Sequence, residues 1–137
     1  MQPDPVVVAK LFDVLARKVH TMPAARDLTA SQWAILRHLK HPYSNGRTAE
    51  QMASYFSEPA ASMKLALTSL VRKGLLESDS DADDVNERYA LTDAGEGKLA
   101  NDPIAFAANA IAKMSIADQA EFGRLLEEML TALTIEE

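Results

Sequence analysis

The sequence predicts a mainly α-helical domain in which one short β-hairpin interrupts a series of helices. Apolar residues recur at helical spacing along most of the chain, and several of these segments begin with a threonine or aspartate suited to capping. Two short strand-like segments, "LLES" at 75–78 and "RYALT" at 88–92, flank an acidic stretch. A chain of 137 residues suits a single domain, spanning 1–137, with a sizeable core.

The first helix is predicted over residues 5–20, which carry one wide apolar face made of Val7, Val8, Leu11, Leu15 and Val19. Pro23 then breaks the pattern. In "LTASQWAILRHLKHP", Thr29 and Gln32 have the spacing of a capping box, and Pro42 ends the helix. Its buried face is expected to hold Trp33, Leu36 and Leu39.

The third helix is predicted to begin with the same capping arrangement as the second. Thr48 and Gln51 are expected to cap it, and Met52 and Phe56 are expected to point inward. A fourth helix follows, with Ser57 as its N-cap and Pro59 in its first turn, and Gly74 closes it. Its predicted buried stripe consists of Met63, Ala66, Leu67, Leu70 and Val71.

Further helices follow the hairpin. Thr92 is expected to cap the first of them, and Asp102 with Pro103 is expected to start the next. The last helix begins after Ser115 and carries a long apolar stripe, Phe122, Leu125, Leu126, Met129, Leu130 and Leu133.

Charge is distributed unevenly along the chain. The net charge of −6 argues mildly against nucleic acid as a partner. However, residues 47–76 hold four basic and two acidic residues, whereas residues 77–90 hold one basic and six acidic residues. The middle of the chain is therefore weakly basic, and the hairpin candidate is acidic.

Several classes of site are disfavoured. Without cysteine the chain has no disulfide, thiolate metal site or cysteine nucleophile. We interpret His20, His38 and His41 as solvated surface residues and expect no metal site, because zinc needs three or four converging ligands. The acidic run "DSDADD" lacks the central glycine and final glutamate of a calcium loop.

Enzymes and membrane proteins are disfavoured as well. We find no glycine-rich phosphate loop and no nucleophile with a plausible base, so we expect neither catalysis nor a cofactor. No apolar run approaches the roughly 18 residues of a membrane helix. The first residues lack the layout of a secretory signal. We therefore expect a soluble cytoplasmic protein without membrane contact.

The order of the elements favours a helix-turn-helix with a wing. Two short capped helices packed against a third, then a β-hairpin, is the arrangement that presents the third of these helices to the DNA major groove. The alternative to a DNA-recognition helix is that this third helix is an ordinary surface helix. The outward face of the fourth helix of the chain holds Ala61, Lys64, Leu65, Thr68 and Arg72. Small and hydroxyl residues allow close approach to bases, and Lys64 can meet a phosphate or a guanine edge.

Four motifs carry a resemblance to a known family. "LTASQWAILRHL", "TAEQMASYF", "SMKLALTSLVRKGLLE" and "LTDAG" resemble the MarR family of winged-helix transcriptional regulators, most specifically over residues 28–97. The resemblance implies a homodimer whose segments 5–20 and 98–133 are dimerisation helices. It also implies a pseudo-palindromic double-stranded DNA operator and a small-molecule effector, often phenolic or anionic, bound between these helices and the head.

The terminal helices support dimerisation independently of the resemblance. Segments 5–20 and 116–133 carry wide apolar stripes that one small head can hardly cover. Packing of the two helices on each other within one chain is the alternative. An effector pocket lined by Trp33 is conceivable, but Trp33 fits the core better, and the effector-binding residues stay unassigned.

The hairpin departs from the family pattern. Asp83 occupies the expected aspartate position, but Asp84 and Val85 follow where the family has arginine, and Ser78 stands at another common arginine position. The wing also carries Asp79, Asp81 and Glu87, which would repel phosphate. Arg47 and Arg88 are expected to compensate in part.

Two functional hypotheses follow. In the first, the protein is a sequence-specific DNA-binding regulator. In the second, it is a winged-helix interaction module whose acidic hairpin contacts a basic protein surface. The candidate DNA-binding residues of the first hypothesis are Arg47, Ser57, Ala61, Ser62, Lys64, Leu65, Thr68, Arg72 and Arg88.

Overall fold

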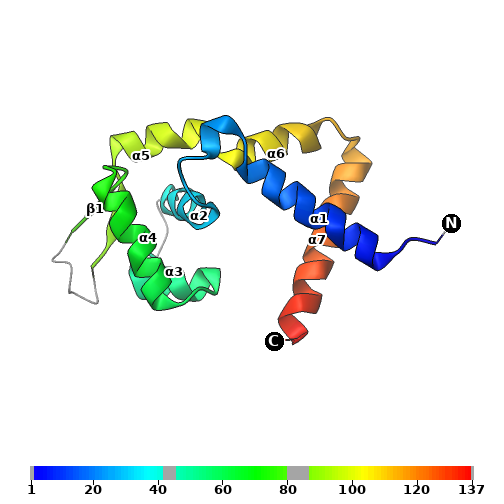
Figure 1. The fold of residues 1–137 in the computed structure, drawn as a ribbon, viewed down its shortest axis with the longest axis horizontal. Coiled ribbons are helices and arrows are strands. Elements are labelled where there is room, and N and C mark those ends of the chain that lie inside the picture. Colours follow the sequence, from blue (N-terminus) through cyan, green and yellow to red (C-terminus); the bar gives the residue numbers. More distant parts are fainter. Residues whose placement is uncertain (1, 42–45, 80–86, 137) are drawn as a thin grey trace. The chain divides into compact units, whose positions relative to one another are not determined.

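The computed structural model describes residues 2–41, 46–79 and 87–136 (Figure 1). The chain divides into two compact units, Met1–Pro103 and Ile104–Glu137. The elements are α1 (Pro5–His20), η1 (Pro23–Ala25), α2 (Ala30–Leu39), α3 (Ala49–Phe56), α4 (Ala60–Arg72), β1 (Leu76–Ser78), β2 (Tyr89–Leu91), α5 (Asp93–Lys98), η2 (Leu99–Asn101), α6 (Pro103–Ala112) and α7 (Ile116–Glu136). The predicted class, mainly helical with one hairpin, is confirmed.

Local capping fixes where the helices of the head begin. Thr29 caps α2: its hydroxyl accepts from the Gln32 N–H at 3.1 Å, and its own N–H donates to Gln32 Oε1 at 3.1 Å. Thr48 and Gln51 form the same reciprocal pair at α3, with both distances 3.2 Å. Both capping boxes are therefore confirmed, and each satisfies donors that a helix start leaves unpaired.

The start of α4 differs from the prediction. Ser57 does not cap α4; it ends α3 in the left-handed conformation, with a φ of 54°, and its N–H bonds back to that helix. The N-cap of α4 is Pro59, and the helix begins at Ala60. The physical reason is that proline disfavours helical backbone in the residue before it, here Glu58.

The core of the first unit lies between α2, α3, α4 and the hairpin. Trp33 is fully buried and its Nε1 donates to the Ala25 carbonyl at 2.9 Å, so it is a core residue. The buried stripe of α4 is narrower than predicted, because Val71 is 37% exposed. The buried apolar residues are Ala25, Leu28, Trp33, Ile35, Leu36, Leu39, Met52, Ala53, Met63, Leu67, Leu70, Leu75, Leu76 and Tyr89.

Strands β1 and β2 pair antiparallel, with Leu76 opposite Leu91 and Ser78 opposite Tyr89. An isolated bridge between Thr48 and Arg88 ties β2 to the start of α3. Helix α5 packs closely on this hairpin, because a Cβ at Gly95 would lie 2.2 Å from the Leu75 carbonyl oxygen. The hairpin is thus anchored to α5 near Leu75, at its base, and to the start of α3 near Arg88, toward its tip.

The histidines are less solvated than predicted. His38 is half-buried: its Nε2 lies 3.0 Å from the Gly46 carbonyl oxygen, and its ring packs 4.9 Å from that of Tyr55. His20 is also half-buried, whereas His41 is exposed. Both half-buried rings lie against neighbouring backbone that periodicity alone does not reveal. Within the described residues, no group of three acidic or histidine side chains could hold a metal ion.

The terminal helices expose their apolar stripes. No residue of α1 is buried, and Leu11 is 64% exposed. In the second unit, Leu130 of α7 is likewise 64% exposed. None of the helices in the described ranges is both long enough and apolar enough to cross a membrane.

Candidate nucleic-acid interface

Helix α4 presents an exposed face of mixed chemistry. Ala61, Ser62 and Arg72 are exposed, and Leu65 is 72% exposed. Thr68 is half-buried, and its hydroxyl donates to the carbonyl of residue 64, one turn earlier, at 2.9 Å. This face combines small, apolar and cationic side chains, which is a surface that can approach base edges.

The Lys64 ammonium group is bonded to the wing, although 38% of the Lys64 side chain is exposed. Its Nζ donates to Glu87 Oε2 at 2.7 Å and to the Tyr89 hydroxyl at 2.9 Å. Ser78 in turn donates its hydroxyl hydrogen to Glu87 Oε1. We call Lys64, Ser78, Glu87 and Tyr89 the inner cluster. It joins the middle of α4 to both strands of the hairpin.

The electrostatics of the inner cluster favour a retained ion pair. Burial alone would raise the pKa of Glu87, but hydrogen bonds from Lys64 and Ser78 outweigh it and hold the pKa below its ordinary value. Hydrogen bonds to Glu87 and Tyr89 raise the pKa of Lys64. Glu87 was predicted to belong to an exposed acidic wing. This prediction is wrong, because Glu87 is only 6% exposed. It lies two residues before Tyr89, and side chains two apart on an extended segment share a face.

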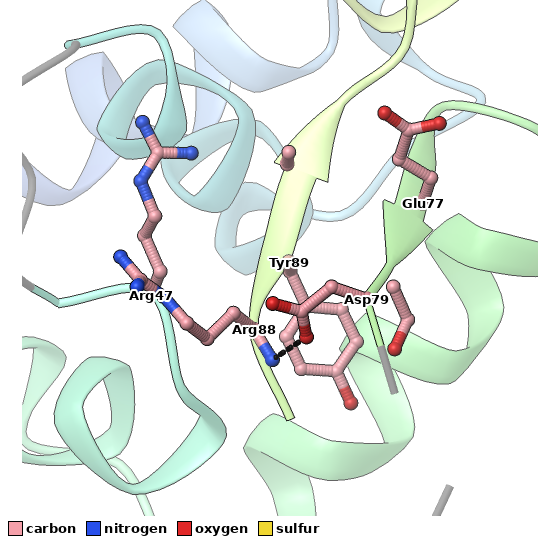
Figure 2. Close-up of a pocket in the computed structure, with 7 residues that line it drawn as sticks. Arg47, Glu77, Asp79, Arg88 and Tyr89 are labelled. Carbon is pink, nitrogen blue, oxygen red and sulfur yellow. Dashed lines mark hydrogen bonds between the residues drawn. The ribbon is translucent and has the colours of Figure 1, made fainter. Parts of the chain in front are cut away.

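The opposite side of the hairpin carries an open cleft of about 350 Å³ (Figure 2). We call it the outer cleft; Arg47, Glu77, Asp79, Arg88 and Tyr89 are among the residues that line it. Its frame is made of backbone. The Tyr89 N–H donates to the Arg47 carbonyl at 3.0 Å, and the Asp79 N–H donates to the Arg88 carbonyl at 3.1 Å. Asp79 Oδ1 also accepts from the Arg88 N–H at 2.8 Å.

The outer cleft holds two guanidinium groups, those of Arg47 and Arg88. Within residues 2–41, 46–79 and 87–136, neither the Arg47 nor the Arg88 side chain makes a hydrogen bond or an ion pair. Figure 2 shows both arginine side chains extending to the same side of β2, while Glu77 lies on β1. The cations that sequence reasoning proposed as substitutes for the missing wing arginines therefore line one cleft.

The tip of the wing lies outside the described residues. This applies to Asp81, Asp83, Asp84 and Val85, so the expected acidic tip stays a prediction. Ser78, which stands where the family commonly has arginine, is instead a member of the inner cluster.

Comparison with known proteins agrees with this geometry. Residues 28–95 match the family model of the winged helix DNA-binding domain. The chain has a MarR-type winged-helix fold. A search of curated protein sequences finds no match.

Solved structures share the MarR-type fold over nearly the whole chain. One is the S. aureus MepR–DNA complex, which is 19% identical with a TM-score of 0.73, covering 90% of this chain and 96% of that one. Another is the PcaV transcriptional regulator from Streptomyces coelicolor with its natural ligand. It is 19% identical with a TM-score of 0.72, covering 97% of this chain and 99% of that one.

The MarR-type head contains a second cavity that sequence reasoning missed. It measures about 230 Å³ and is lined by Arg37, His38 and His41 of the α2 region and by Tyr55 and Phe56 of α3. Arg37 Nε donates to both carboxylate oxygens of Asp102, at 2.9 and 2.8 Å. Its Nη2 is buried and has no hydrogen-bond partner within the described part of the chain. The available signal in the sequence was one arginine and two histidines close together, with Arg37 and His38 in the last turn of α2 and His41 just past its end.

Proposed function

We propose that this MarR-type protein is a sequence-specific DNA-binding transcriptional regulator that acts as a homodimer and responds to a small-molecule effector. The observation that carries the proposal is the exposed face of α4, where Leu65 is 72% exposed and, among the described residues, Lys64 is hydrogen-bonded to Glu87 of the wing. The winged-helix match over residues 28–95 and the MepR–DNA complex support it. We assign the protein no catalytic activity and place it in the cytoplasm.

The reading surface is the exposed part of α4. Ala61 and Ser62 leave room for the helix to approach base edges, and Leu65 suits apolar contact with a thymine methyl group. Arg72, at the helix end, suits a phosphate or a guanine edge. Lys64 is left out of this surface because Glu87 holds its ammonium group.

Dimerisation accounts for the exposed apolar stripes of α1 and α7. Side chains such as Leu11 and Leu130 lose contact with water when a second copy covers them, and each buried methylene contributes about 0.8 kcal/mol. Two heads in one dimer would then bind half-sites about 34–36 Å apart.

Sedimentation tests the dimer directly. We expect the wild type to sediment as a dimer and Leu11→Glu to shift it toward monomer. Lys10→Glu, on the exposed surface of the same helix, is the control for an added carboxylate and should leave the dimer intact. An unchanged dimer in Leu11→Glu would exclude α1 from the interface.

The effector part of the proposal rests on the PcaV structure, which was solved with its natural ligand. The α2–α3 cavity is a place where a small ligand fits, and Arg37 is among the residues that line it. We expect a small phenolic or anionic compound to release the protein from its operator in a screen. If no such compound weakens DNA binding, the regulator acts without an effector of this class.

Fluorescence anisotropy tests DNA binding. Labelled duplex from the protein's own promoter is compared with random duplex at several salt concentrations. We expect promoter-selective binding that weakens with salt, and weaker binding for Arg72→Gln, whereas Lys113→Gln outside the head serves as control. Equal or absent binding on both duplexes would overturn the proposal and favour the interaction module. In that case, charge reversal of Asp83 and Asp84 should abolish capture of a basic protein partner.

A further inference from the structure

We infer that the outer cleft seats one phosphate group of the DNA backbone between Arg47 and Arg88. The inference rests on the proposed DNA-binding function and adds a contact site to it. In this site, Arg47 and Arg88 take the role of the wing-tip arginines, whose positions hold Asp84 and Val85 in this chain. The phosphate is thus held beside Arg88, where the strand pairing ends, rather than at positions 84 and 85.

The two arginines are brought together by the backbone. Arg47 precedes α3, and Arg88 precedes β2, more than forty residues later in the chain. The bridge from Thr48 to Arg88 and the 3.0 Å hydrogen bond from the Tyr89 N–H to the Arg47 carbonyl hold these segments side by side. The cleft is therefore formed before any ligand arrives, and only the side chains need to adjust.

The chemistry of the pair suits phosphate. A guanidinium is planar, permanently charged and able to donate two parallel hydrogen bonds to a phosphate. Within the described residues, both side chains are free of protein partners, whereas the nearby Lys64 ammonium is already held by Glu87. An incoming anion therefore meets donors that need not first break an ion pair.

The charges of the cleft favour DNA over a free anion. Glu77 and Asp79 also line it, so its two cations are balanced by two carboxylates. Asp79 is fixed by its 2.8 Å contact with the Arg88 N–H and cannot turn away without losing it. A free phosphate gains little at a cleft with balanced charge. A phosphate carried on DNA is held there by the rest of the interface.

The position of the cleft fits a wing contact. Ser78 pairs with Tyr89 in the ladder, and Asp79 with Arg88 is the next hydrogen-bonded step toward the tip. Arg88 therefore lies at the tip end of the paired strands, between Glu87 and Tyr89 of the inner cluster that joins the hairpin to α4. If α4 enters the major groove, the adjoining backbone is what this end of the wing meets.

The salt dependence of operator binding tests the inference. Each neutralised phosphate contributes roughly 0.9 to the slope of log affinity against log salt. We expect Arg47→Gln with Arg88→Gln to lower the slope by about 0.9 for each bound head, with promoter selectivity retained. The single variants should each lose less than this, because the remaining arginine still contacts the shared phosphate. An unchanged slope in the double variant, or a fall of about 1.8 per head, would overturn the shared seat.

A variant that keeps the positive charge and a variant that removes a negative charge sharpen the test. Arg88→Lys keeps the charge, so its slope should stay close to that of the wild type while the affinity falls a few-fold. Glu77→Gln removes a competing carboxylate and should strengthen operator binding a few-fold. Lys113→Gln, outside the head, is the control and should change neither quantity. Stronger loss in Lys113→Gln than in the double variant would contradict the assignment.

A titration with inorganic pyrophosphate distinguishes the two sources of phosphate. The arginine Nε–H signals are followed by NMR without DNA, in the wild type and in each glutamine variant. A lowered DNA slope without saturable pyrophosphate shifts supports the backbone source. Saturable shifts at both arginines with no change of slope would overturn it in favour of a free phosphate ligand. If neither the salt slope nor the arginine NMR signals change while the wild type still selects its promoter, the inference fails and the proposed function stands.

Discussion

The two sides of the hairpin treat basic residues differently. On the inner side, Lys64 donates to Glu87 and Tyr89, and its charge is matched by a buried carboxylate. On the outer side, Arg47 and Arg88 line an open cleft and make no side-chain bond to the described residues. Alternation along the chain places the Glu87 carboxylate on the inner side with Lys64 and leaves its neighbour Arg88 on the outer side with Arg47.

The largest expected effect comes from breaking the inner side. Lys64→Met leaves the Glu87 carboxylate buried without its cation, which we expect to lower the free energy of unfolding by about 2–3 kcal/mol. Urea denaturation measures the change. The salt slope of DNA binding should stay unchanged, because Glu87 already neutralises the Lys64 ammonium group in the free protein.

Arg72→Met is the matched control for this variant. Arg72 lies on the same helix and is exposed, so its loss should change stability by less than about 0.5 kcal/mol while lowering the salt slope. Adding Glu87→Gln to Lys64→Met should restore part of the lost stability. Equal stability of Lys64→Met and Arg72→Met would show that the inner cluster is not a stabilising device.

Acid should weaken the inner side selectively. The pKa of Glu87 is held below its ordinary 4.5 by the hydrogen bonds of Lys64 and Ser78, in spite of burial. A lowered folded pKa contributes stability that is present above 4.5 and is lost as pH falls through the folded value. The difference in unfolding free energy between wild type and Glu87→Gln should therefore shrink below this pH, as measured by urea denaturation. A difference that is constant with pH would mean that Glu87 titrates alike in the folded and unfolded chain.

Lys64 gives the complementary alkaline prediction. The pKa of Lys64 is raised above 10.5 by its hydrogen bonds to Glu87 and Tyr89. Its contribution to the free energy of unfolding is therefore fully present below that pH. The contribution should be lost as pH rises through the folded value. Lys64→Met should lack this alkaline loss in the same urea series, and its persistence would assign the loss to other groups.

A smaller effect is expected from the second donor to Glu87. Ser78→Ala removes the hydroxyl that donates to Oε1 and should cost about 1 kcal/mol of unfolding free energy. Ser62→Ala, an exposed serine on α4, is the matched control and should be close to neutral in thermal denaturation. If both substitutions are equally mild, Lys64 alone is sufficient to hold the carboxylate.

Sequence reasoning succeeded where the physics is local. The capping boxes at Thr29 and Thr48 depend on residues three apart, and both are present. It was wrong at Ser57, because the restriction imposed by Pro59 outweighed the capping preference of serine. It could not place Glu87, because the contact with Lys64 spans 23 residues and depends on how the hairpin packs on α4. The outer cleft likewise depends on the bridge between Thr48 and Arg88, which the spacing of residues in the sequence does not predict.

The smallest change in stability is expected on the outer side. Arg88→Gln removes a guanidinium that has no partner among the described residues, so the free energy of unfolding should change by less than about 0.5 kcal/mol. Its backbone N–H still donates to Asp79 Oδ1, which keeps the hairpin frame intact. Thermal denaturation and operator binding measured on the same sample separate the two sides of the wing. A large loss of stability in Arg88→Gln would show that the outer arginine is structural, and the contrast between the two sides would then be lost.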